Sequence, residues 1–129
     1  MAIPTELLMQ ITSRLAPDGG PATAQDALGV WATLFGKLGP LLGPLSNELL
    51  FARSMTRRQP GFPWLPRLEP GAESTAFAGF VPCLHGRSPE EIVAVNRALL
   101  ETYTTALADL IGGQLATRLL SAAFPETVS

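Results

Sequence analysis

Apolar residues recur every three or four positions along most of this chain, which is the spacing of helices that bury one side. The first such segment is 4–15, where Leu7, Ile11 and Leu15 share a side and Pro4 suits the first helical position. A connector rich in glycine and proline follows. We therefore expect a first amphipathic helix over 4–15.

A second helix is predicted from Thr23, a suitable N-cap residue, to near Gly39. Its apolar stripe, spaced alternately by three and four residues, consists of Leu28, Trp31, Phe35, Leu38 and Leu42. Glycines at 29, 36 and 43 are seven residues apart along the same segment. Because glycine inside a helix is destabilising, this repeat indicates either a groove for the backbone of another helix or a loose, kinked region.

Two Leu-Gly-Pro-Leu repeats follow, and their prolines force a break in the helix. A third helix is therefore expected from Pro44 to about Gln59. Its predicted inner side consists of Leu45, Leu49, Ala52 and Met55, and Leu50 and Phe51 are expected to widen it.

The segment 59–71 carries a proline at every third or fourth position, which favours an extended polyproline II course. Phe62, Trp64 and Leu65 lie between these prolines, so we expect an ordered strap that packs across the bundle. A short helix over 72–81 is predicted next, and Pro82 is expected to end it.

The strongest local signal is Ser88-Pro89-Glu90-Glu91, which combines an N-cap serine, proline at the first position and a capping box. The helix that it starts is predicted to run over 88–124, and 37 residues would reach roughly 55 Å. Such a helix either bends at Gly112-Gly113 or has its overhang covered by a second copy of the chain. The second alternative predicts a homodimer through Leu99, Tyr103, Ala108, Gly112 and Ala116.

Composition decides the fold class. The chain has 21 Leu and 17 Ala against 5 Val and 4 Ile, and this balance favours helix over strand. We therefore predict one all-α domain over 1–129, a bundle of about four to five helices with the strap between helices three and four and a long C-terminal helix.

Charge and length exclude several classes of partner. A formal net charge of −2 gives no global field for nucleic acid, and no uncharged stretch is long enough to span a membrane. We expect a soluble, cytoplasmic protein. Eight arginines against one lysine indicate a GC-rich bacterial source.

Candidate chemistry is sparse. One cysteine excludes an internal disulfide, and one histidine excludes a metal centre with several histidines. Cys83 and His85 are two residues apart and can face one cleft, but no hydrolase signature surrounds them. We expect no catalytic residues, no metal and no cofactor, and an enzyme is the last of three functional interpretations.

The second interpretation is a sensor for a small apolar ligand or cofactor, with the strap at 60–71 as its lid. The residues predicted to line the site are Trp31, Phe35, Trp64, Phe77, Phe80, His85 and Tyr103. The sequence favours the alternative that these aromatic residues form the core beside a histidine without a ligand.

The first interpretation is a non-catalytic regulatory or protein-interaction module, acting as a homodimer in bacterial signalling. No acid occurs between Glu48 and Glu69, whereas that stretch holds Arg53, Arg57, Arg58 and Arg67. The arginines either complement the dipole of the third helix or form a patch for an acidic protein partner.

Overall fold

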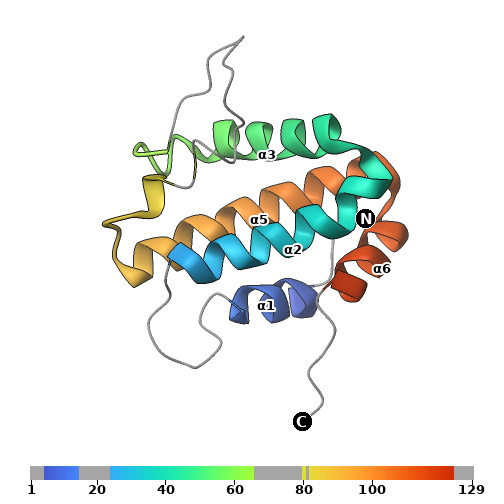
Figure 1. Cartoon of the computed structure of the whole chain (residues 1–129), viewed down its shortest axis with the longest axis horizontal. Coiled ribbons are helices and arrows are strands. Elements are labelled where there is room, and N and C mark those ends of the chain that lie inside the picture. The colour runs from blue at the N-terminus through green and yellow to red at the C-terminus, as the bar shows by residue number, and fades with distance from the viewer. Residues whose placement is uncertain (1–4, 15–23, 66–79, 81, 124–129) are drawn as a thin grey trace.

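The computed structural model describes residues 5–14, 24–65, 80 and 82–123 of the chain (Figure 1). Its named helices are α1 (Thr5–Ser13), α2 (Ala24–Leu42), α3 (Pro44–Arg58), α5 (Pro89–Ile111) and α6 (Gly113–Ala123). Residues 82–84 are also helical, and the described ranges contain no strand. The predicted all-α bundle is therefore confirmed.

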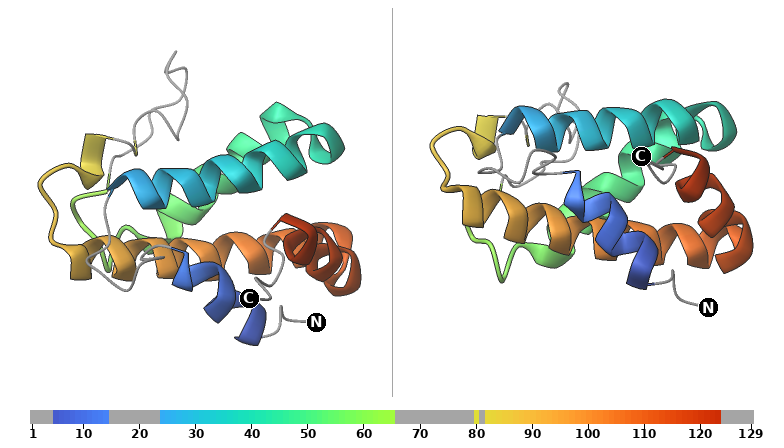
Figure 2. Two further views of the ribbon diagram at one scale, coloured as in Figure 1. Left: turned by 60° about the horizontal axis from the view of Figure 1, so that its bottom comes forward. Right: turned by 90° about the horizontal axis from the view of Figure 1, so that it is seen from below.

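Helix α5 is the central element, because it packs against α1, α2, α3 and α6. Helices α2, α3 and α5 form the long body of the molecule, with α1 against α5 and α6 turned back at one end (Figures 1 and 2). The buried apolar residues of these helices form one cluster. Its largest fully buried side chains include Trp31, Phe51, Phe80 and Tyr103.

The start of α5 is as predicted. The Glu91 backbone N–H donates to Ser88 Oγ at 3.2 Å, and the Ser88 N–H donates to Glu91 Oε1 at 3.3 Å. The hydrogen bond from the Ser88 N–H lowers the pKa of the Glu91 carboxyl, and desolvation opposes it. The Ser88 hydroxyl, which donates to Glu91 Oε1 at 3.2 Å, and Arg87 lower this pKa further. Pro89 occupies the first turn, where its missing N–H removes no helical bond.

Glycine makes both helix-to-helix corners. Gly43 (φ 86°, ψ 149°) joins α2 to α3, and Gly112 (φ 93°, ψ 145°) joins α5 to α6. Each glycine N–H donates to the carbonyl four residues earlier at 2.8 Å, so each corner completes one helix before the next begins. The C-terminal helix predicted over 88–124 is therefore interrupted at Gly112. Of the two predicted alternatives, a bend at Gly112-Gly113 or a straight helix covered by a second copy, the structure has the bend.

The predicted end of the second helix is wrong. Helix α2 continues through Pro40 to Leu42 rather than ending near Gly39, since a proline in the last turn removes only one hydrogen bond. Residues 82–84, which follow the predicted fourth helix, are helical. The predicted helix over 72–81 lies outside the described residues except for residue 80, which is helical.

The predicted strap has a different backbone from the one expected. Its described part, 59–65, forms successive turns, with Phe62 N–H donating to the Arg58 and Gln59 carbonyls and Leu65 N–H to the Phe62 carbonyl. The polyproline II prediction is therefore wrong for 59–65. Leu65 is buried and Phe62 and Trp64 are partly buried, so this part does pack on the bundle as expected.

The inner side of α3 agrees with the predicted one in part. Leu50, Phe51 and Met55 are buried as expected, whereas Leu49 is 51% exposed. The polar residues Asn47 and Ser54, which were not predicted there, are buried as well. They are tolerated inside because each has a hydrogen-bond partner: Asn47 accepts from the Tyr103 hydroxyl, and Ser54 donates to the Leu50 carbonyl at 2.8 Å.

The glycine repeat of α2 does not hold another described helix. A side-chain carbon built on Gly29, Gly36 or Gly39 would meet no heavy atom within 4 Å. Helix α2 is also continuous through this region. Within the described residues, neither the groove nor the loose region is present.

Candidate functional site

Four of the residues predicted to bind a ligand pack against one another. Trp31 lies 5.5 Å from Tyr103 and 5.8 Å from Phe35, measured between ring centroids. Phe51 completes the cluster at 4.9 Å from Trp31 and 5.3 Å from Phe80. Because edge-to-face and tilted contacts place each ring on its neighbours, a ligand here would have to displace core side chains.

The polar atoms of this cluster are also occupied. Trp31 Nε1 donates to Asn96 Oδ1 at 2.8 Å, and Asn96 Nδ2 donates to the Ile92 carbonyl at 2.7 Å. The Tyr103 hydroxyl donates to Asn47 Oδ1. No buried side-chain nitrogen or oxygen in the described ranges lacks a partner. Burial raises the pKa of Tyr103 well above its ordinary value, so the phenol is a neutral donor.

The other predicted ligand residues lie elsewhere. The Arg87 guanidinium carbon sits 4.4 Å from the centroid of the Trp64 ring, a cation–π contact, and Arg87 also pairs with Glu91 at 3.5 Å. His85 is exposed in the turn after residues 82–84. Phe77 lies outside the described residues. Among the six described residues of the predicted set, His85 is the exposed one.

The pKa of the Cys83 thiol is shifted in the direction opposite to that of a catalytic cysteine. Burial raises the pKa of its thiol, and the nearby Arg87 only partly opposes this shift. A catalytic cysteine needs a depressed pKa so that the thiolate is present at neutral pH. The described part of the chain also contains no group of three or more His, Cys, Asp or Glu residues placed to hold a metal ion.

A groove lies between α3 and α5, with a volume of about 540 Å³. Figure 1 shows the two helices lying alongside each other in this region. The residues that line it are Leu49, Ala52, Arg53, Ser54, Thr56, Arg57, Thr102 and Ala106. Most of its exposed surface is apolar, and two arginines, Arg53 and Arg57, are among the lining residues.

The four predicted patch arginines differ in their surroundings. Arg58 Nε donates to Thr102 Oγ1 at 2.6 Å, and its guanidinium lies 3.6 Å from Glu101. Arg53 and Arg57 are exposed, and neither forms an ion pair with another described residue. Arg67 lies outside the described residues. Arg58 therefore links α3 to α5 through Thr102 and Glu101. Arg53 and Arg57 line the groove and form no ion pair with a described residue.

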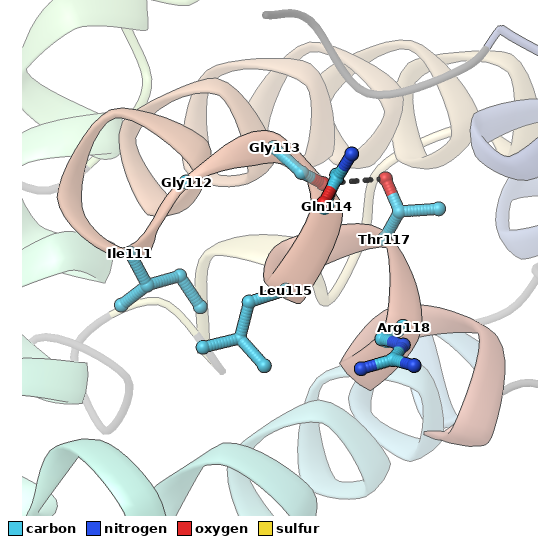
Figure 3. Close-up of a pocket in the computed structure, with 7 residues that line it drawn as sticks. All are labelled: Ile111, Gly112, Gly113, Gln114, Leu115, Thr117 and Arg118. Atoms are coloured by element: carbon cyan, nitrogen blue, oxygen red, sulfur yellow. Dashed lines mark hydrogen bonds between the residues drawn. The ribbon is translucent and has the colours of Figure 1, made fainter.

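A second hollow, of about 860 Å³, lies at the corner between α5 and α6. Ile111 and Leu115 point to the same side of this corner, and Thr117 Oγ1 donates to the Gly113 carbonyl at 2.7 Å (Figure 3). Leu115 is 41% exposed and the neighbouring Leu110 is 59% exposed. The corner therefore presents apolar surface to solvent.

Most of the residues predicted to form the dimer interface are buried inside the chain itself. Leu99, Tyr103, Ala108 and Ala116 are buried against the chain's own residues, and only Gly112 is exposed. The fold-back of α6 supplies part of this cover, since Ala116 is in the same core cluster. These four side chains are not open to a second copy.

Sequence reasoning missed Asn47, Asn96 and the groove. Asn96 is next to Val95 and three residues before Leu99, so its spacing puts it on the apolar face of the helix. This position is the feature of the sequence from which its burial could have been predicted. The groove has no local signal, because its walls come from helices that are far apart in the chain.

No protein-family model, curated protein or solved structure matches this chain. No helix among the described residues combines the length and the apolar character needed to cross a membrane.

Proposed function

We propose that this chain is a non-catalytic helical module that binds a protein partner in the groove between α3 and α5. The observation that carries the proposal is that the groove combines the exposed side chain of Leu49 with Arg53 and Arg57, which form no ion pair with another described residue. Apolar contact gives such a surface affinity, and charge gives it selectivity. The complementary partner is a protein segment with both acidic and apolar side chains.

Neighbouring charges support this assignment. Two acids directly precede groove residues in the sequence, Glu48 before Leu49 and Glu101 before Thr102. Glu101 lies 3.6 Å from Arg58 and 3.8 Å from Arg97. Within the described residues, neither acid forms an ion pair with Arg53 or Arg57. Since the whole chain has a net charge of −2, attraction of an acidic partner would be local to this groove.

The test is selection from a library of random short peptides on the immobilised protein. We expect the wild type to enrich peptides with at least two acids and a large apolar residue. The double variant Arg53→Gln, Arg57→Gln should lose this enrichment, while Arg118→Gln, an exposed arginine on α6, should keep it. No enrichment, or equal enrichment by the double variant, would contradict the proposal.

A homodimer also remains a proposal, now through the α5–α6 corner rather than through the buried face of α5. The exposed side chains of Leu110 and Leu115 support it. Mass by light scattering on a sample at micromolar concentration tests it: twice the chain mass is expected, falling to one chain mass with Leu110→Gln, Leu115→Gln. A monomer in the wild type would refute it.

A regulatory or signalling role in the cytoplasm of a bacterium is the setting that we propose for this binding. It is supported by the arginine-rich composition, the single cysteine and the lack of a catalytic set among the described residues. The sensor for a small apolar ligand has less support, because Trp31 packs against Phe35 and Tyr103, and Phe80 packs against Phe51 in the same cluster.

A further inference from the structure

We propose that the occupant of the α3–α5 groove is an amphipathic helix that presents one large apolar residue and two carboxylates at successive turns of one face. This inference rests on the proposed function and specifies the conformation and the side-chain spacing of the partner. It follows from three features of the groove: the spacing of its recognition groups, its hydrogen-bonding state and the size of its wall residues.

The recognition groups are spaced by helical turns. Leu49, Arg53 and Arg57 are four residues apart along α3 and line the same groove. Four residues rise about 6 Å along a helix, so the row extends over about 12 Å. Thr102 and Ala106 repeat the same interval on the α5 wall. A partner helix with an apolar residue at i and acids at i+4 and i+8 has the matching interval.

The hydroxyl groups of the groove already donate hydrogen bonds to backbone carbonyls of their own helices. Ser54 Oγ donates to the Leu50 carbonyl at 2.8 Å, and Thr56 Oγ1 donates to the Ala52 carbonyl at 3.1 Å. Thr102 Oγ1 donates to the Ala98 carbonyl at 3.0 Å and accepts from Arg58 Nε.

An extended segment needs partners for its backbone N–H and C=O groups, and these hydroxyls offer it no free hydrogen. A helix satisfies its own backbone and needs partners only for its side chains. The side chains of the groove that keep free N–H donors are Arg53 and Arg57, whose guanidinium groups match carboxylates in shape and charge. The hydrogen-bonding state of the groove therefore favours a helix over a strand.

The wall residues permit a close approach. Ala52 and Ser54 on α3 and Ala106 on α5 have short side chains. Packed helix axes lie about 8–10 Å apart, and the shorter separations require small residues at the contact. The space between the walls thus suits the side chains of one helix face.

Three labelled peptides of one composition test the inference by fluorescence anisotropy at low salt. The first carries Leu, Glu and Glu at i, i+4 and i+8 and is held helical by a lactam bridge on its opposite face. The second moves the two acids to the opposite face. The third keeps the order of the first but contains D-residues that prevent helix formation.

We expect the first peptide to bind at least about fivefold more tightly than the other two. The protein variant Arg53→Gln, Arg57→Gln should weaken this binding about fivefold, while Arg118→Gln leaves it within about twofold. All of these arginines are exposed, and circular dichroism of each variant checks that the fold is intact.

The two proposals fail in different ways. If the third peptide binds as tightly as the first and loses affinity in the double arginine variant, the helix inference is overturned and the acidic-partner function stands. If no peptide binds, or the double variant binds the first peptide as well as the wild type does, both proposals are overturned.

Discussion

Replacing Gly112 by alanine tests whether one backbone position folds α6 back onto the bundle. Gly112 has φ 93° and ψ 145°, a conformation that is reached almost only by glycine. An added side-chain carbon would meet no heavy atom within 4 Å, so the substitution introduces no steric overlap with neighbouring elements. Any loss of stability therefore reports the backbone conformation itself.

The expected magnitude follows from the strain. A non-glycine residue in this region costs about 1–3 kcal/mol. At about 2.1 cal/mol/K per residue, a chain of 129 residues has an unfolding entropy of about 0.27 kcal/mol/K. We therefore expect Gly112→Ala to lower Tm by about 4–11 °C.

The assay is thermal unfolding followed by far-ultraviolet circular dichroism. Gly36→Ala is the matched control, because Gly36 lies exposed inside α2 and has open space around it. It should raise Tm by about 2–4 °C, since alanine is favoured over glycine in a helix by about 0.5–1 kcal/mol. An unchanged or raised Tm for Gly112→Ala would refute the assignment of strain to this corner.

Three further substitutions or reactions test the core and the cysteine. Asn96→Leu should lower the free energy of unfolding in urea by about 1–3 kcal/mol, because it leaves the buried Trp31 indole N–H without an acceptor; a change below about 0.5 kcal/mol would contradict this. Since the folded state holds Tyr103 neutral, stability should be independent of this group below about pH 10 and should fall above it, where the unfolded chain ionises. Tyrosinate absorbance from this single tyrosine should appear only on unfolding, and its appearance in the folded protein at about pH 10 would contradict the burial. Cys83 should react with iodoacetamide at neutral pH more slowly than a short cysteine peptide does, because burial raises its pKa, and a faster reaction would revive the enzyme interpretation.

Local signals predicted some elements well. Ser88 and Glu91 set the start of α5 through hydrogen bonds within four residues, so the sequence alone contains the whole determinant. The end of α5 was different. The Gly112-Gly113 pair permits both a bend and a continuous helix, and the choice depends on the cover that α2 and α5 give to Ala116 and Leu120.

The site was predicted only in part for the same reason. A stretch without acids pointed to Arg53 and Arg57, but it did not distinguish them from Arg58, whose partner Thr102 comes from α5. The apolar spacing of α3 placed Leu49 inside, whereas the polar Asn47 is buried because Tyr103 reaches it from another helix. Partners of this kind are set by tertiary packing and have no signature in the local pattern.

The most direct measurement of the central claim is a map of backbone amide shifts by nuclear magnetic resonance as the helical acidic peptide is added. We expect the largest changes at Ala52, Arg53, Thr56 and Ala106, which line the groove, and little change at Glu90 in the first turn of α5. Shifts confined to the α5–α6 corner, or none at saturating peptide, would contradict the assignment of the α3–α5 groove as the binding surface.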